Sequence, residues 1–313
     1  MQQQRHLDVV VAGLALADVI GRPVEFNRPP KRGTLKLIDS ITLTTGGNVS
    51  NVGIDLARLG FRVGAITRVG NDSIGRFVAQ HYRTFGIDTE GVIIDAKAQT
   101  SATIVGVDKD GERTFLHTRG CMKNFRASDI LSRIPLVQKA PILVFGYLGL
   151  LPETEKEFKT LFRTLKQKTD VKILLDTAAS PRVTRRALAG FLPYVDYFIP
   201  SYEEAALITG RKTPEGILEA FLKAGAPYVV GVKLAERGCY ISDGKKARYV
   251  RARRVKKVVD ATGAGDAFVA GFVAGILRGL DPFSSARLAN SVAASCVSAV
   301  GASTAIKALS EYL

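Results

Sequence analysis

The sequence predicts an α/β fold of three layers, in which a mainly parallel central β-sheet is flanked by helices and carries a small β-sheet lid. From about residue 130 onward, apolar runs alternate with helical patterns, as in right-handed βαβ units. Two stretches nearer the N-terminus, at about 20–45 and 97–120, are extended and polar at alternate positions, so they interrupt this series. We therefore expect residues 1–313 to form one domain whose lid consists of these two segments.

The first predicted strand is Leu7–Ala12, an apolar run of the kind that is buried on both faces of a parallel sheet. A secretory signal peptide is the alternative for the longer run Val9–Ala17. Asp8 stands at the start of that run and Gly13 divides it, and such a peptide needs an uninterrupted apolar stretch. The strand is therefore favoured.

The lid is predicted from Lys36–Thr44 and Thr100–Phe115, because Asp110-Gly111 is typical of a hairpin turn. A strand is expected at Val63–Val69, and the turn that follows it starts a helix. The remaining apolar runs and helical patterns predict strands Ile142–Phe145, Ile173–Leu175, Tyr197–Ile199 and Tyr228–Val232, and helices Thr154–Lys168, Glu203–Thr209, Pro214–Ala224 and Pro282–Ala299.

Composition argues against several classes of protein. No run of about 18 apolar residues is present, so a membrane span is not expected. Cys121, Cys239 and Cys296 are far apart and form no CxxC pair, which disfavours a disulfide framework and a zinc site. This cysteine usage fits a reducing, cytoplasmic location.

Part of the formal net charge of +15 lies in the segment Arg248–Lys257. Its basic side chains alternate with Tyr249, Val250, Ala252 and Val255, which predicts strands with one solvated face. Neither an RNA-binding motif nor helix-turn-helix spacing accompanies it. We interpret the charge as favouring solubility and anionic nucleotides, and nucleic acid is not an expected partner.

The most informative motif is Asp260-Ala261-Thr262-Gly263-Ala264-Gly265-Asp266-Ala267-Phe268, where small residues precede an acid and an apolar helical pattern. The bare backbone of Gly263, Ala264 and Gly265 lets amide groups point at a phosphate where a helix begins. Asp266 in the first turn can accept a proton from a hydroxyl that attacks this phosphate. The motif therefore indicates phosphoryl transfer to an alcohol. The alternative is a glycine-rich helix start in which Asp266 only favours the helix dipole.

A second motif, Gly46-Gly47-Asn48-Val49-Ser50-Asn51, also begins a predicted helix. The side-chain amides of Asn48 and Asn51 both donate and accept hydrogen bonds, which suits the hydroxyls of a sugar. The alternative is that Asn48 caps the helix.

Together these residues resemble the PfkB (ribokinase-like) family of carbohydrate and nucleoside kinases. The signatures Gly46–Asn51 and Asp260–Gly271 stand in the family's order, about 200 residues apart, with the Gly70/Asp72/Gly75 turn between them. The resemblance covers the whole chain. It implies the ribokinase-like fold and an ATP-dependent carbohydrate kinase.

By this resemblance Asp266 corresponds to the catalytic base, and the amides of Gly263, Ala264 and Gly265 correspond to the anion hole around the transferred phosphoryl group. The positions that contact the sugar in the family match Asp18, Gly47, Asn48 and Asn51.

The cofactors that the resemblance implies are ATP and Mg²⁺. Glu204 matches the acid that positions magnesium, usually through water, but Ser201 stands where the family has asparagine. A serine hydroxyl reaches less far and lacks the second group of an amide, so the details of magnesium binding stay open. Asp260 and Thr262 match a site for a monovalent cation such as K⁺.

The nucleotide is expected beside Lys233, Ala235, Gly238 and Gly301. Ala235 replaces a glycine of the family pattern, and its methyl group is tolerable unless the φ angle there is positive.

The expected acceptor is a small sugar or a sugar acid. Leu16 and Leu148-Gly149 stand where ribose kinases carry an asparagine and an acid, which disfavours ribose. Arg113 and His117 are candidates to bind a ring oxygen or a carboxylate, and the alternative is that they face outward from a lid strand.

A nucleoside kinase, with Phe26, Phe115 and Tyr147 stacking on the base, is the nearest alternative function. A non-catalytic sugar-sensing or nucleic-acid-binding protein is an alternative of another class. The lid is also a candidate surface for a homodimer.

Overall fold

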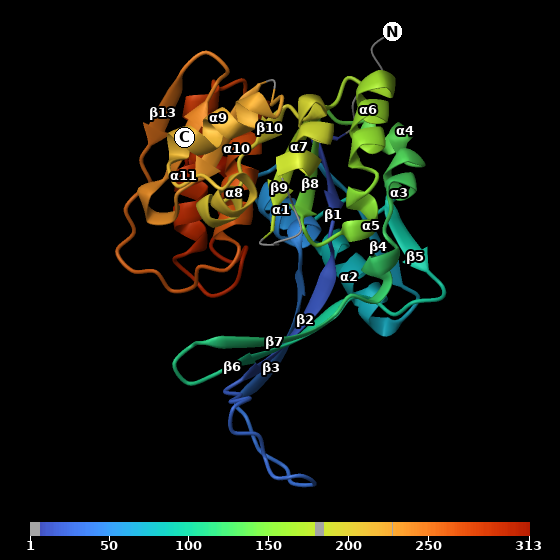
Figure 1. Ribbon diagram of the computed structural model, residues 1–313. Helices are drawn as coiled ribbons and strands as arrows, with labels where there is room; N and C mark the ends of the chain where they lie inside the picture. Colours follow the sequence, from blue (N-terminus) through green and yellow to red (C-terminus); the bar gives the residue numbers. More distant parts are fainter. Residues whose placement is uncertain (1–6, 179–184, 227) are drawn as a thin grey trace.

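The computed structural model describes residues 7–178, 185–226 and 228–313 (Figure 1). Within these residues, nine strands form one sheet in the order β13-β12-β11-β10-β9-β8-β1-β4-β5. All neighbours are parallel except at one edge, where β12 and β13 run antiparallel. The strands are β1 Val9–Gly13, β4 Val63–Gly70, β5 Val92–Asp95, β8 Ile142–Leu148, β9 Lys172–Thr177, β10 Tyr197–Phe198, β11 Val229–Lys233, β12 Cys239–Ser242 and β13 Ala247–Val250.

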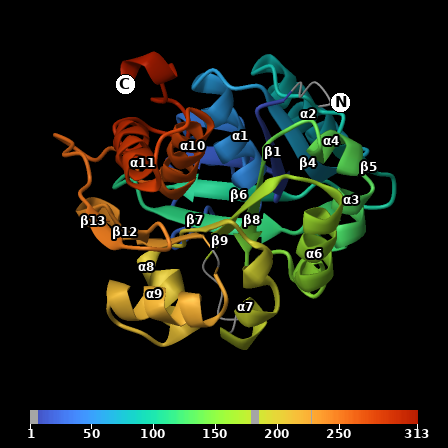
Figure 2. The same cartoon turned by 90° about the horizontal axis from the view of Figure 1, so that it is seen from above.

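Helices cover both faces of this sheet, as Figure 2 shows from above. Strand β1 is wholly apolar because Val9 and Val11 pack on one face and Val10 and Ala12 on the other. One face carries α1 Asn48–Arg58, α2 Ser73–Thr84, α10 Ala264–Leu277 and α11 Pro282–Cys296. The opposite core includes residues of α3 Ala127–Leu131, α4 Ile134–Val137, α6 Phe158–Lys168, α7 Arg185–Phe191, α8 Tyr202–Thr209 and α9 Pro214–Lys223.

A small sheet of four strands projects from the body of the molecule (Figure 1). Its order is β3-β2-β6-β7, with β2 Leu16–Arg22, β3 Ser40–Gly46, β6 Ala102–Val107 and β7 Arg113–Thr118. The register aligns Asp18 with Thr103, and Thr103 with His117, in one row across three strands. Residues in one row of a sheet share a face, so these three polar side chains point the same way.

The predicted α/β class, the mainly parallel sheet and the separate small sheet are confirmed. The small sheet has one strand more than we predicted, because β2 continues the apolar run that follows β1. The predicted helix Thr154–Lys168 is divided into α5 Pro152–Glu155 and α6. No helix among the described residues has the length and apolarity that crossing a bilayer requires.

The prediction of strands through the basic segment Arg248–Lys257 is wrong beyond Val250, where β13 ends. The side-chain amide of Asn290 in α11 donates to the carbonyls of Val250 and Arg251, 3.1 and 3.0 Å away. These bonds hold the backbone at the helix, so the chain leaves the edge of the sheet.

Candidate active site

Helix α10 begins at a position that only glycine can occupy. Gly263 is its N-cap with a φ angle of 77°, and a Cβ atom there would lie 2.4 Å from Cβ of Ala302. The helix is 14 residues long, so its first amides form a site of positive potential. The amide of Ala264 donates to the Ala261 carbonyl at 3.2 Å and so already takes part in the turn. The ammonium of Lys233 lies 3.5 Å from where a Cβ of Gly265 would be, which adds a full positive charge beside these amides.

Asp266 follows in the first turn of α10 and is 6% exposed. Its Oδ2 atom accepts hydrogen bonds from the Asn51 amide at 2.9 Å and from the Tyr147 hydroxyl at 2.7 Å. Its Oδ1 atom is buried and has no hydrogen-bond partner among the described residues. A buried oxygen without a partner is costly, so Oδ1 is the atom that is free to accept a proton.

Burial raises the pKa of Asp266 to about 6, and the negative charge of Asp176 adds to the increase. The hydrogen bonds from Tyr147 and Asn51 and the charge of Lys233 act in the opposite direction. A carboxyl group with this pKa is ionised at neutral pH and is basic enough to take up a proton.

Lys233 lies at the end of β11 and forms an ion pair with Asp176 of 2.9 Å. Burial disfavours its charged form, but the carboxylates of Asp176 and Glu204 outweigh this effect and raise the pKa of Lys233. The lysine is therefore a permanent cation beside the first turn of α10. Asp176 was not among the site residues that we predicted, although an acid at the carboxyl end of a parallel strand is a recognisable signal.

Glu204 accepts a hydrogen bond from the Thr177 hydroxyl and one of 3.1 Å from the Ser201 amide. Ser201 is the N-cap of α8, so this serine and Glu204 belong to one helix start. Carboxylate oxygens of Glu204 and Asp176 are the hard ligands that Mg²⁺ prefers, and the donor set fits a magnesium ion bound chiefly through water and phosphate.

A cavity of about 470 Å³ lies between the small sheet and the body, a size that is typical of sites for small ligands. Tyr147 lines the cavity and also bonds Asp266, so the cavity leads to the carboxylate. Further lining residues are Leu14, Leu16, Gly47, Thr103, Phe115, His117, Arg119, Met122, Lys123, Leu150, Pro152 and Glu153.

The row of polar residues on the small sheet reaches this cavity. The Thr103 hydroxyl and Nδ1 of His117 are 3.1 Å apart, and both residues line the cavity. Asp18 is next in the row, and burial raises its pKa although Thr103 donates a hydrogen bond to it. Arg119 and Lys123, which were not among the predicted site residues, add positive charge to the lining.

Asn48 has a different position from the one that we expected. Its Oδ1 accepts a bond from the Leu14 amide at 2.8 Å, and its Nδ2 donates to the Ala12 carbonyl at 2.9 Å. The side chain is fully buried and joins α1 to the end of β1. Gly47 does line the cavity, with a φ angle of 86°.

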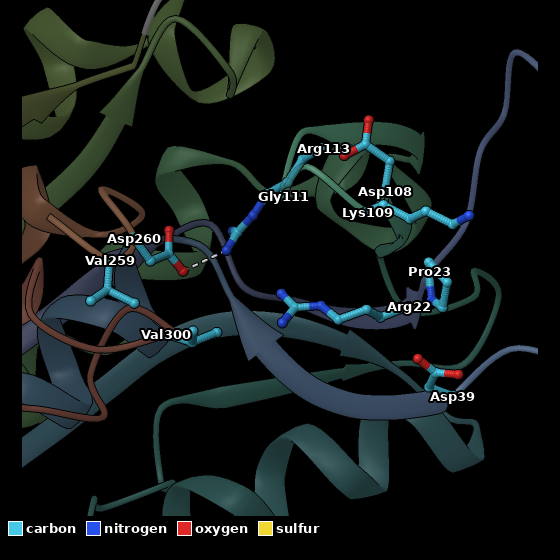
Figure 3. Close-up of a pocket in the computed structure, with 10 residues that line it drawn as sticks. All are labelled: Arg22, Pro23, Asp39, Asp108, Lys109, Gly111, Arg113, Val259, Asp260 and Val300. Carbon is cyan, nitrogen blue, oxygen red and sulfur yellow. Dashed lines mark hydrogen bonds and ion pairs between the residues drawn. The ribbon is translucent and has the colours of Figure 1, made fainter.

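The residues expected around the nucleotide lie in loops that follow β11 and α11. Ala235 has a φ angle of 51°, so it adopts the conformation in which a methyl group is strained. Gly238 has a φ angle of 95°, and a Cβ there would lie 2.1 Å from the Val250 carbonyl oxygen. The Gly301 amide donates to Asp260 at 2.9 Å. Asp260 also pairs with Arg113 of the small sheet (Figure 3).

Residues 6–309 match the family described as pfkB family carbohydrate kinase. The 2-dehydro-3-deoxygluconokinase of Bacillus subtilis strain 168 is 32% identical over 283 residues, which are 86% of this chain and 85% of that protein. A ribokinase of Haemophilus influenzae is 26% identical over 311 residues, 97% of each chain.

Among solved structures, Arabidopsis thaliana ribokinase complexed with ribose and ATP superposes with a TM-score of 0.83. The identity is 24%, and the superposition covers 98% of this chain and 97% of that one. At this identity the likeness concerns the fold, and the ribokinase-like fold that we predicted is confirmed.

Proposed function

The chain belongs to the pfkB family of carbohydrate kinases, and from this premise we propose that it transfers the γ-phosphoryl group of ATP to a hydroxyl of a small sugar acid, with Asp266 as the general base. The observation that carries the proposal is the buried Oδ1 atom of Asp266, which has no partner among the described residues and lies in the first turn of α10. Residues 1–313 act as one kinase domain in this proposal, and the small sheet serves as its lid.

The chemistry follows from the surroundings of Asp266. The acceptor hydroxyl gives its proton to Oδ1 while its oxygen attacks the γ-phosphorus atom of ATP. The bond from this phosphorus to the bridging oxygen breaks, and ADP leaves with that bond's electron pair. Asn51 and Tyr147 hold the carboxylate in place through Oδ2. The amides of Gly263 and Gly265, together with Lys233, stabilise the charge on the transferred group. Magnesium, near Glu204 and Asp176, shields the charge of the ATP phosphates when it is bound.

A sugar acid is favoured because two permanently cationic side chains, Arg119 and Lys123, line the cavity against one acid, Glu153. Burial and Arg119 lower the pKa of His117, so its neutral ring offers a hydrogen bond and no charge. Guanidinium and ammonium groups bind carboxylates through charge-assisted hydrogen bonds. The 32% identity to a 2-dehydro-3-deoxygluconokinase supports the same class. We place the contacts to the sugar hydroxyls at Asp18, Gly47 and Asn51.

The nucleoside kinase alternative has less support. Phe115 and Tyr147 line the cavity, but the ring of Phe26 lies against Gly106 of the small sheet, where a Cβ atom would be 2.3 Å from it. Phe26, one of the three aromatic residues that we expected to stack on a base, therefore packs within the small sheet instead.

The test is ADP release from ATP and magnesium across sugars, sugar acids and nucleosides. We expect turnover to be highest with a six-carbon sugar acid. Arg119→Met should lower kcat/KM for that acid by about tenfold or more, since a hydrogen bond to a charged group contributes roughly 1.5–3 kcal/mol, and leave a neutral sugar nearly unaffected. Preference for a nucleoside would contradict the proposed class, and the absence of turnover with every acceptor would contradict the kinase itself.

We also propose that the lid mediates a homodimer. Leu43, Ile104 and Leu116 are 44%, 53% and 55% exposed, and the strand register places them in one row across the small sheet. A contiguous apolar face of this kind is typical of an interface. Sedimentation equilibrium should give the mass of two chains, and the mass of one chain at high concentration would refute the proposal.

A further inference from the structure

The side chain of Arg113 forms two contacts with the loop that precedes α10. Its Nη2 atom lies 2.5 Å from Oδ2 of Asp260, and its Nη1 atom donates to the Thr262 hydroxyl at 2.6 Å. Arg113 is the first residue of β7, so the small sheet supplies this cation to the loop (Figure 3). Both charged side chains are largely buried, at 23% exposed for Arg113 and 8% for Asp260.

Further acceptors around this loop also have donors within the protein. Asp260 accepts through Oδ2 from the Gly301 amide and through Oδ1 from the Thr262 amide, each at 2.9 Å. The Cys296 thiol contacts the carbonyl oxygens of Ala302 and Thr262, at 3.0 and 3.4 Å. The carboxylate, the hydroxyl and two carbonyls around Asp260 are therefore already hydrogen-bonded by the chain itself.

This arrangement differs from what a bare monovalent cation needs. An ion such as K⁺ exchanges its hydration shell for several oxygen atoms whose lone pairs are free. Here Asp260 and Thr262, the two residues that the resemblance associated with such an ion, both accept hydrogen bonds from Arg113. A guanidinium carries the same unit charge, is always ionised, and matches a carboxylate and a neighbouring oxygen with its planar set of donors.

We propose that Arg113 is a built-in cation in this chain, which takes the place of a monovalent ion at Asp260 and Thr262. The ion pair neutralises Asp260 next to the N-terminus of α10, so the positive potential for phosphate is preserved without an added ion. Because the cation comes from the small sheet, its contact with the loop also ties the lid to the phosphate side of the site.

Thermal unfolding tests whether Arg113 replaces a monovalent ion, and this measurement does not depend on catalysis. The protein is unfolded in KCl and in tetramethylammonium chloride at the same ionic strength. The wild type should show the same Tm in both salts. In Arg113→Met the oxygens of Asp260 and Thr262 are released, so about 100 mM K⁺ should raise the Tm by about 2–4 °C.

ADP release gives the second measurement and rests on the proposed kinase function. Wild-type turnover should differ by less than about twofold between the two salts. Arg113→Met should lose about tenfold or more in tetramethylammonium and regain part of this loss in K⁺. If the enzyme shows no turnover at all, the proposed function fails while the thermal comparison still decides this inference.

Arg22→Met is the matched control. Arg22 is another arginine of the small sheet and, like Arg113, lines a second cavity, which is distinct from the one beside Tyr147. The ion pair drawn in Figure 3 nevertheless joins Asp260 to Arg113. This variant should respond to K⁺ as the wild type does. Three results would each overturn the proposal. Wild-type turnover could increase more than about fivefold in K⁺, or the wild-type Tm could rise in K⁺. The third is an Arg113→Met variant whose Tm and turnover are both the same in K⁺ and in tetramethylammonium. If Arg113→Met does not fold, the wild-type comparison of the two salts is sufficient to decide.

Discussion

The two oxygen atoms of the Asp266 carboxylate have different surroundings. Oδ2 accepts two hydrogen bonds, from Asn51 and Tyr147, whereas Oδ1 is buried without a partner among the described residues. The donors on Oδ2 fix the orientation of the group and stabilise its charge, while burial and Asp176 destabilise that charge. As a result of these opposing effects, the carboxylate is ionised at neutral pH, and its Oδ1 atom is free to accept a proton.

These opposing effects predict the pH dependence of the enzyme. A base must be deprotonated to act, so kcat/KM should rise with pH through about 6, the pKa of Asp266. Tyr147→Phe removes a hydrogen bond that lowers this pKa. The pKa of Asp266 should therefore increase, and the acidic limb of the kcat/KM profile should move to higher pH by about one unit.

Tyr82→Phe is the control for this shift, because the Tyr82 hydroxyl is fully buried and bonds Ser50 instead. Its profile should coincide with that of the wild type. An acidic limb that stays in place in Tyr147→Phe, or moves to lower pH, would show that the tyrosine does not tune the base.

At the scale of single elements, the turn that contains Ala235 carries local strain. The 3₁₀ turn η3 Ala235–Arg237 follows β11, and Ala235 has a positive φ angle of 51°. Glycine adopts this conformation without steric cost, so Ala235→Gly should raise the free energy of unfolding by about 0.5–1 kcal/mol. Urea unfolding measures the change.

The same substitution in a regular helix should have the opposite sign. Ala57 lies in α1, and Ala57→Gly should lower the free energy of unfolding by about 1 kcal/mol. Ala235→Gly could instead destabilise the protein. The strain energy at Ala235 would then be smaller than the free-energy cost of the conformational entropy that glycine adds to the unfolded chain.

Some elements could be predicted from sequence because their signals are local. The glycine-rich start of α10 was recognisable from its small residues, and Gly263 has the positive φ angle that glycine adopts freely. Its close packing on Ala302 is a long-range contact that the structure revealed. The strand β2 could not be separated from β1, because the apolar run continues from one strand to the other. Segment Arg251–Lys257 has the alternation of a strand but pairs with no strand in the described part of the chain, and alternation alone carries no information about partners.

For the whole molecule, the candidate site is formed by residues that are far apart in the chain. Asn51 and Asp266 are 215 positions apart, and Tyr147 and Asp266 are 119 apart, yet both pairs are hydrogen-bonded. Individual residue types could suggest Asp266 and Asn51. The acid on β9 has a local signal, because it stands at the carboxyl end of a parallel strand. Its ion pair with Lys233, the bond of Tyr147 to Asp266 and the contact of Arg113 with Asp260 depend on how sheet, helices and lid pack, so no local pattern predicts these contacts.

The most direct test of the account is the chemical step in Asp266→Asn, measured as single-turnover phosphoryl transfer to the acceptor that the wild type prefers. Asparagine has the same shape and can still accept bonds from Asn51 and Tyr147 through its oxygen, but it cannot take up the proton. Calorimetry should show that the acceptor still binds within about threefold of the wild-type Kd, while transfer slows by about 10²–10⁴-fold. Transfer by the folded variant within about tenfold of the wild-type rate would contradict the assignment of Asp266 as the base.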